Sequence, residues 1–242
     1  MGDEELKEKS AALISGLKEC QDELGTGFIF GAQILDPQNV ERQFDVIEGK
    51  IKDGDDKEEN KKNKTWVPWY NMHKMLTGLV DTYKYTGNEE ALEVAKGLGD
   101  WIYNRASKWS KSTNNQVLWT EYGGMNDCLY DLYYYTGDER YLESAHKFDQ
   151  TDLFTDVTSG AANKLNGKHA NTTIPKFVGA LKRYSVLKAK DELGEGDEQY
   201  LEWAEKFFDL AVDKYAYITG GVSVMEHFRD EAKLDGTRNA TN

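Results

Sequence analysis

The side chains best suited to chemistry stand where predicted helices begin. They are aromatic rings, imidazoles and carboxylates, a combination that suits a sugar. Aromatic faces stack on the apolar face of a sugar ring, imidazoles and carboxylates bond its hydroxyl groups, and a glutamate can protonate the leaving oxygen. Four groups in chain order share this placement: Trp66, Trp69, Tyr70 and His73; Trp119, Glu121 and Tyr122; His169 and Asn171; Glu226 and His227.

Each of these residues also has a structural interpretation, which the sequence leaves open. His73 fits a core histidine bonded to the backbone, and Trp66 and Trp69 fit packing aromatics. His169 fits an exposed loop residue, Asn171 a plain helix N-cap, and Glu226 an ordinary surface carboxylate. The sequence shows no Ser–His–Asp order, glycine-rich phosphate loop or Cys-x-x-Cys pair, so nothing in it indicates nucleotide or thiol-redox chemistry.

The elements that must position these side chains are predicted to be helical hairpins. Apolar residues recur every three or four positions from Met72 to Tyr83, which is typical of an amphipathic helix. Gly87 can take the left-handed conformation that ends this helix, and Asn88 can cap the next one. A second apolar stripe, from Ala91 to Ile102, completes the hairpin.

This turn recurs along the chain. Gly137-Asp138 and Gly196-Asp197 repeat the pattern of Gly87-Asn88, and Gly2-Asp3 resembles the same turn with its first helix missing. Repeats of about 50 residues, each made of two helices, are typical of stacked helical hairpins. The repeat therefore predicts an all-α fold in which alternate helices form an inner and an outer layer around a cavity.

The local pattern predicts the remaining elements. Pro175 is tolerable in the first turn of a helix, and Cys20 and Cys128 are interpreted as small core residues. Residues 109–115 are predicted to be a polar connector, 151–168 a long loop and 49–63 a flexible charged insertion. We expect helices at residues 3–24, 39–48, 139–148, 173–187 and 198–215, another with an apolar face from Met125 to Tyr133, and short extended segments at 27–31 and 220–228.

Length and charge exclude several classes of protein. The 242 residues are enough to bury one sizeable core, and we expect one partial domain over residues 1–242. A net charge of −13 and a pI near 4.8 argue against nucleic acid or an anionic membrane as partner, and no apolar run is long enough to span a bilayer. The start from Met1 to Glu5 is not a signal peptide. Because we expect the chain to begin inside a repeat, this leaves the location of the parent protein open.

Four segments in this order resemble the catalytic domain of glycoside hydrolase family 127 and its relative family 146, the β-L-arabinofuranosidases. The resemblance extends over nearly the whole chain from Gly2. The segments are Trp69-Tyr70-Asn71-Met72-His73-Lys74, Glu121-Tyr122-Gly123-Gly124-Met125-Asn126-Asp127, His169-Ala170-Asn171-Thr172, and Gly220-Gly221 with Glu226-His227-Phe228.

The resemblance implies a fold and a reaction. The fold is an (α/α)6 toroid followed by β-sandwich domains, and the reaction is retaining removal of β-L-arabinofuranosyl units from plant glycans. The family uses a zinc-bound cysteine as nucleophile and a glutamate as acid/base, which would be Glu226. His73 and His169 would hold sugar hydroxyl groups, with Glu121 a weaker contact. The aromatic residues Trp69, Tyr70 and Tyr122 complete the substrate-binding set that we expect.

The chain departs from the family in its cysteines. The family has a Cys-Glu-Thr-Cys-like segment just after a stretch similar to residues 236–242, and a later cysteine pair that supplies the nucleophile. Cys20 and Cys128 do not match these positions. We therefore expect an incomplete toroid, an internal fragment lacking N- and C-terminal parts of a secreted or periplasmic bacterial hydrolase. The zinc ligands would lie beyond Asn242, with no metal site in this chain, and the fragment alone would be inactive.

Two other functions stay open at this stage. Another toroid enzyme, either a polysaccharide lyase or a hydrolase with two carboxylates, would share the fold. A lyase needs a cationic partner for its uronate substrate, and the acidic character of the chain counts against it. The second alternative is a non-enzymatic helical-repeat binding module, which would need no glutamate and histidine gathered at the hairpin openings.

Overall fold

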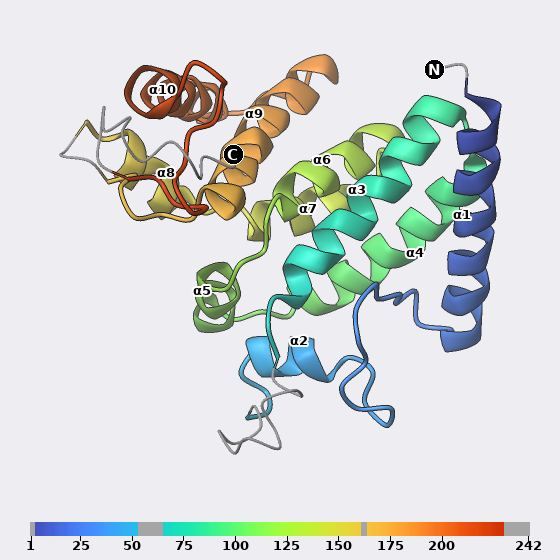
Figure 1. Ribbon diagram of the computed structural model, residues 1–242. Helices are drawn as coiled ribbons and strands as arrows, with labels where there is room; N and C mark the ends of the chain where they lie inside the picture. Colours follow the sequence, from blue (N-terminus) through green and yellow to red (C-terminus); the bar gives the residue numbers. More distant parts are fainter. Residues whose placement is uncertain (1–2, 53–64, 161–163, 230–242) are drawn as a thin grey trace. The chain divides into compact units, whose positions relative to one another are not determined.

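The computed structural model describes residues 3–52, 65–160 and 164–229, and the regular elements in these ranges are all α-helices (Figure 1). The prediction of an all-α fold is confirmed, and the helical hairpins are consistent with part of an (α/α) toroid. The predicted charged insertion falls mostly outside the described residues. The helices are α1 (Glu4–Leu24), α2 (Arg42–Ile47), α3 (Pro68–Thr86), α4 (Glu89–Ala106), α5 (Lys111–Trp119), α6 (Met125–Thr136), α7 (Glu139–Lys147), α8 (Thr151–Thr158), α9 (Ala170–Ala189) and α10 (Glu198–Tyr215).

The chain divides into two compact units, Met1–Phe148 and Asp149–Asn242, named here the N-terminal and the C-terminal unit. The N-terminal unit holds α1 to α7, and the C-terminal unit holds α8 to α10. No helix of the described ranges is long and apolar enough to cross a membrane.

The two complete hairpins of the N-terminal unit have the turns that the sequence predicts. Gly87 ends α3 with a φ of 69°, and the side chain of Asn88 accepts a hydrogen bond from the Ala91 backbone N–H at the start of α4. Gly137 ends α6 in the same left-handed conformation, and Asp138 caps α7. A left-handed residue followed at once by an N-cap reverses the chain within two residues.

These hairpins stack in two layers. The first helices, α3 and α6, pack against each other, and so do the second helices, α4 and α7 (Figure 1). The N-terminal helix α1 packs mainly against α4, which places it in the layer of second helices. Its N-cap, Asp3, accepts a hydrogen bond from the Leu6 N–H.

An aromatic cluster holds the openings of the hairpins together. Trp69 from α3 has no exposed surface, and its ring lies 5.0 Å from that of Phe44 on α2 and 5.2 Å from that of Phe148. Trp101 of α4 and Trp109 complete the contacts around it. Buried aromatic rings in edge-to-face contact contribute both apolar burial and a favourable ring geometry.

A buried ion cluster attaches α2 to α4. Arg105, near the end of α4, pairs with Glu41, Asp45 and Glu48 at N–O distances of 2.5, 2.6 and 2.7 Å. The Arg105 side chain is 9% exposed and the Glu48 side chain is fully buried. Burial would raise the pKa of Asp45, but hydrogen bonds from Arg105 and Asn39 lower it below its usual value. The cluster borders a cavity of about 530 Å³.

The C-terminal unit is built on α9 and α10, which pack against each other, with α8 against α10 (Figure 1). Its core is aromatic: the rings of Phe177 and Phe207 stack 4.0 Å apart and nearly parallel. Phe228, from the segment after α10, is fully buried in the same core. This packing brings residues 224–228 back to the beginning of α9.

Several sequence predictions need correction. The polar connector expected at 109–115 lies largely in α5, which Ser110 caps, and the loop expected at 151–168 begins with α8. Helix α9 begins at Ala170, so Pro175 lies inside it rather than in its first turn. A short polar helix that buries a single apolar side chain, as α5 buries Val117, shows too weak an apolar periodicity to be recognised from the sequence.

Two further predictions also fail. The third turn does not repeat the first two, because α9 ends at Ala189 and a loop separates it from Asp197. Asp197 instead accepts hydrogen bonds from Arg183 and from the Gly194 N–H. Cys20 is exposed and is not a core residue, whereas Cys128 is buried as predicted.

Candidate functional site

In the N-terminal unit, the candidate residues gather where α3 begins and where the chain enters α6. His73, two turns into α3, is 5% exposed, and its Nδ1 accepts a hydrogen bond from the Gly124 backbone N–H at 3.1 Å. The ring of Tyr70 meets it edge to face at 5.9 Å. Half-buried Glu121 and buried Tyr122 immediately precede this contact in the chain. The structure therefore brings together the first two predicted groups.

The protonation state of His73 follows from this environment. Burial, together with the positive charge of Lys74, lowers the pKa of His73 to about 4. The ring is therefore neutral at pH 7. Because Nδ1 accepts a hydrogen bond, the single ring proton is on Nε2, which makes that nitrogen a donor.

Gly123 permits the close approach of the two segments. Its φ is +59°, and a Cβ at this position would lie 2.5 Å from Nδ1 of His73. A side chain would thus be both strained and in collision with the imidazole. Gly123 in the predicted motif therefore has a packing reason, which is to let the Gly124 N–H lie against His73.

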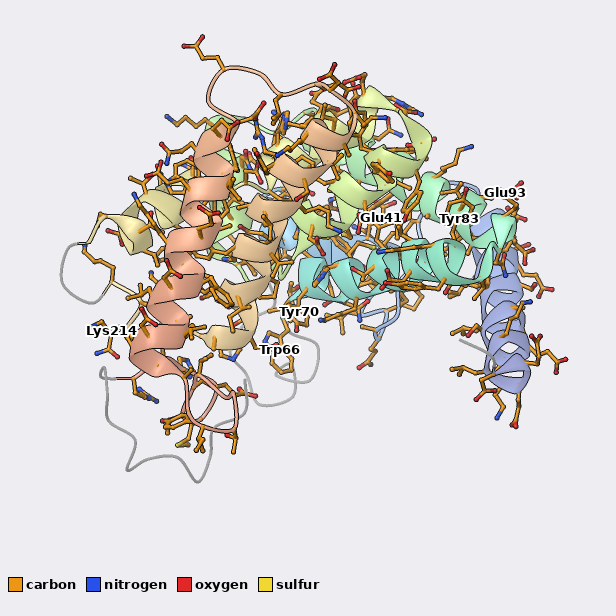
Figure 2. The ribbon with its side chains drawn as sticks, turned by 90° about the horizontal axis from the view of Figure 1, so that it is seen from above. Glu41, Trp66, Tyr70, Tyr83, Glu93 and Lys214 are labelled. Atoms are coloured by element: carbon orange, nitrogen blue, oxygen red, sulfur yellow. The ribbon has the colours of Figure 1, made fainter. Side chains whose placement is uncertain are left out.

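The aromatic residues of this region separate into a buried and an accessible set. Trp69 and Tyr122 have no exposed surface and pack in the aromatic cluster, so the structure favours the packing interpretation for both. Tyr70 borders a groove of about 300 Å³, and beside it Trp66 is 78% exposed (Figure 2). Trp66 and Lys74 were not in the predicted substrate-binding set, although Lys74 follows Tyr70 by four residues and so shares its helix face.

In the C-terminal unit, His169 and Glu226 meet. His169 is the N-cap of α9, and its Nε2 lies 3.3 Å from Oε2 of Glu226. The Ala170 N–H donates to the Glu226 carbonyl at 2.7 Å, and the ring of His227 lies 5.0 Å from that of His169. Asn171, predicted as an N-cap, lies inside the first turn of α9 instead.

The backbone at Glu226 is strained. The N–H groups of Val224 and His227 each donate to the carbonyl of the other, so residues 224–227 form a tight two-residue turn. Its central residues, Met225 and Glu226, have φ values of 50° and 65°. Such turns normally take Asn, Asp or Gly, because a left-handed residue with a larger side chain costs about 1–2 kcal/mol. Strain of this kind clusters at functional sites.

We expect Met225→Asn to increase the free energy of unfolding by about 0.5–1 kcal/mol, because asparagine tolerates the left-handed conformation better. The Met225 side chain is exposed, so little packing is lost. Urea unfolding of the two proteins would measure the difference. Leu193→Asn, also at an exposed apolar residue outside the turn, is the control and should not stabilise the chain. Equal stabilisation by both variants would contradict the strain at the turn.

The described residues do not form a metal site. No group of three or more His, Cys, Asp or Glu side chains in these ranges could hold a metal ion. Burial raises the pKa of the Cys128 thiol well above its usual value, which disfavours the thiolate that zinc and nucleophilic chemistry both require. The donors for zinc implied by the family resemblance are therefore not found in the part of the chain described.

The chain thus consists of helical hairpins that carry imidazole, carboxylate and aromatic side chains where helices begin. Residues 1–240 match the family described as Beta-L-arabinofuranosidase, GH127 catalytic domain, and the chain belongs to this family. The predicted relationship to family 127 is thus confirmed.

Two further comparisons complete this result. A search of curated proteins finds no significant match. A solved structure titled as a GH127 beta-arabinofuranosidase is similar to this chain with 25% sequence identity and a TM-score of 0.46. The similarity covers 65% of this chain and 24% of that one, so the chain spans about a quarter of the solved structure's length.

Proposed function

We propose that the parent protein is a retaining glycoside hydrolase that removes β-L-arabinofuranosyl units from plant-type glycans, with Glu226 as its general acid/base. Membership of the GH127 family supports hydrolysis of a carbohydrate over the lyase and the non-enzymatic binding module. The observation that carries the role of Glu226 is its strained turn, which holds the carboxylate against His169.

The geometry of Glu226 suits proton transfer. Its side chain is 63% exposed, so one carboxyl oxygen can reach a substrate while Oε2 contacts the imidazole of His169. The bond between the Ala170 N–H and the Glu226 carbonyl fixes the backbone of the turn. In the first step of a retaining reaction, Glu226 would donate a proton to the leaving oxygen. In the second, it would take a proton from the attacking water. His169 orients the carboxyl group in both steps.

His73 has a separate role in this proposal. Its neutral ring carries the proton on Nε2, which can donate a hydrogen bond to a sugar hydroxyl oxygen. A cationic histidine would instead place a charge in a site that binds a neutral sugar. Glu121 and Tyr70, next to it in the N-terminal unit, are the further substrate contacts that we propose.

The nucleophile has no candidate among the described residues. The family resemblance implies a zinc-bound thiolate, which would supply the covalent step, but the donors described here do not fit a metal ion. The proposal therefore assigns only acid/base catalysis and substrate binding to this chain.

The stereochemistry of hydrolysis tests the proposed function. The full-length parent protein should release L-arabinose from an aryl β-L-arabinofuranoside, and proton NMR should detect the β-anomer first, because two displacements restore the configuration. Initial release of the α-anomer would contradict the retaining mechanism. Absence of any activity on β-L-arabinofuranosides, with activity on another glycoside, would contradict the substrate assignment.

We expect the 242-residue chain alone to release no arabinose, with or without added zinc. Its only thiols are Cys20, exposed outside any cluster of metal donors in the described ranges, and the buried Cys128. A covalent step through sulfur needs a reactive thiolate, which the family resemblance implies is bound to zinc, and neither thiol lies among metal donors in the described ranges. Release of arabinose from an aryl substrate, followed by absorbance, would contradict this expectation, most directly if Cys20→Ser abolished it.

A further inference from the structure

A groove in the N-terminal unit carries two side chains, the indole of Trp66 and the ammonium of Lys74, that the proposed hydrolysis does not use. It lies where α3 begins, and Figure 2 shows Trp66 and Tyr70 near each other at this end of the helix. At about 300 Å³, its volume is at the lower end of the range of small-ligand sites, about 300–1,000 Å³. The residues that line it are Phe30, Ala32, Gln43, Trp66, Val67, Pro68, Tyr70, Asn71 and Lys74.

The base of the groove is anchored to the core. Phe30 packs edge to face on Phe44, whose ring has no exposed surface. Asn71 accepts a hydrogen bond from the Gly31 N–H, which ties the segment before α2 to the first turn of α3. Tyr70 is held by its ring contact with His73. These contacts fix Phe30, Asn71 and Tyr70 before a ligand binds.

Trp66 is the unusual residue of the groove. Large aromatic side chains are normally well buried, yet Trp66, which lies before α3 and three residues from the buried Trp69, is 78% exposed. An indole in this position offers an apolar face to a flat ligand. A sugar ring fits this requirement, because one face of the ring carries C–H groups and its edge carries polar substituents.

The charge of the groove restricts the kind of sugar. Lys74 is the one charged side chain among the described lining residues, and its Nζ lies 5.1 Å from the centre of the Tyr70 ring. No carboxylate of the described ranges pairs with it. The ammonium lies over the Tyr70 ring, beside the exposed Trp66, and from there it can pair with a carboxylate carried by a sugar stacked on the indole.

We infer that this groove is a glycan-binding subsite for a uronic acid unit, with Trp66 and Tyr70 stacking on the sugar ring and Lys74 pairing with its carboxylate. The inference goes beyond the proposed hydrolysis, since it assigns binding of an acidic sugar to residues outside the Glu226 group. It also predicts a subsite that favours acidic over neutral oligosaccharides, although the chain as a whole carries a negative net charge.

Direct binding tests this inference without reference to catalysis. The 242-residue chain would be titrated with trigalacturonate and, as a matched neutral ligand, with galactotriose, by calorimetry at an ionic strength of about 10 mM. We expect trigalacturonate to bind more tightly, and we expect added salt to weaken its binding but not that of galactotriose. Because the readout is affinity, failure here leaves the proposed hydrolysis untouched, and failure of hydrolysis leaves this result standing.

Three variants locate the site. Trp66→Ala should weaken binding of trigalacturonate by at least about tenfold, as loss of a stacking tryptophan does at other binding sites, and Trp66→Phe should restore part of it. Lys74→Gln should weaken the binding of trigalacturonate about threefold, as expected for an exposed ion pair, and should leave the binding of galactotriose unchanged. Trp119→Ala removes a tryptophan that is 90% exposed but does not line the groove, and should have no effect. Circular dichroism would establish that each variant is folded.

Three results would overturn the inference. These are no binding of trigalacturonate by the unmodified chain, equal losses in Trp66→Ala and Trp119→Ala, and equal, salt-independent affinities for trigalacturonate and galactotriose.

Discussion

Replacing Glu226 by glutamine in the full-length enzyme should decrease turnover of substrates with poor leaving groups by a factor of about 10²–10⁴. Glutamine keeps the size of the side chain but cannot donate the proton that a sugar or alkyl leaving group needs. Aryl β-L-arabinofuranosides with good leaving groups need little protonation, so the first step on these substrates should be nearly unaffected. The measurement is kcat/KM for a series of leaving groups of different pKa.

Two controls make this result specific to the acid/base role. Glu205→Gln changes an exposed glutamate of α10 in the same unit, and should leave kcat/KM unchanged for every substrate. His169→Gln should decrease turnover less than Glu226→Gln does, because it only releases the orientation of the carboxyl group. A uniform loss across all leaving groups in Glu226→Gln would rule out the acid/base assignment and indicate a role in binding or folding.

Replacing Arg105 by methionine should decrease the free energy of unfolding of the N-terminal unit by about 3–5 kcal/mol. The substitution removes the cation that three carboxylates share, one of which belongs to the fully buried side chain of Glu48. Lys50, which lies 2.7 Å from Glu48 and 3.5 Å from Asp45, is half exposed and replaces it only in part. Urea unfolding followed by tryptophan fluorescence would measure the loss, since Trp101 and Trp109 border the same cavity.

A surface arginine and the pH dependence provide the comparison. Arg140→Met removes an arginine that pairs with Asp138 and Asp100 at the surface, and should cost at most about 1 kcal/mol.

The lowered pKa of Asp45 means that its pairing stabilises the fold above its ordinary pKa of 3.8, and that this contribution disappears as the pH falls below that value. The free-energy difference between wild type and Arg105→Met should therefore shrink on acidification. A small or pH-independent difference would contradict the assigned cost of the unpaired carboxylates.

The hairpins themselves could be predicted from the sequence because their signals are local. The left-handed conformation of Gly87 and the capping by Asn88 depend only on residues within a few positions, and apolar spacing fixes the buried face of each long helix. The same holds for Asp3 at the start of α1. Short polar helices such as α5 and α8 carry too little of either signal, and they were predicted as connector and loop.

The candidate site could be predicted only in part, because burial is decided by packing. Sequence alone did not distinguish Trp66 from Trp69, and the tertiary structure makes one an exposed groove residue and the other the centre of an aromatic cluster. The tautomer of His73 likewise depends on the Gly124 N–H, which belongs to another hairpin.

For the C-terminal unit, the sequence identified His169 and Glu226 as residue types suited to sugar chemistry. The tertiary structure decided that they meet, because packing of Phe228 in the core returns the segment after α10 to the beginning of α9. The strained turn at Met225 and Glu226 could not be predicted either, since neither residue favours a positive φ. The local sequence thus determined the helices and the candidate residue types. Long-range packing decided which side chains are exposed, which are neutral and which are paired.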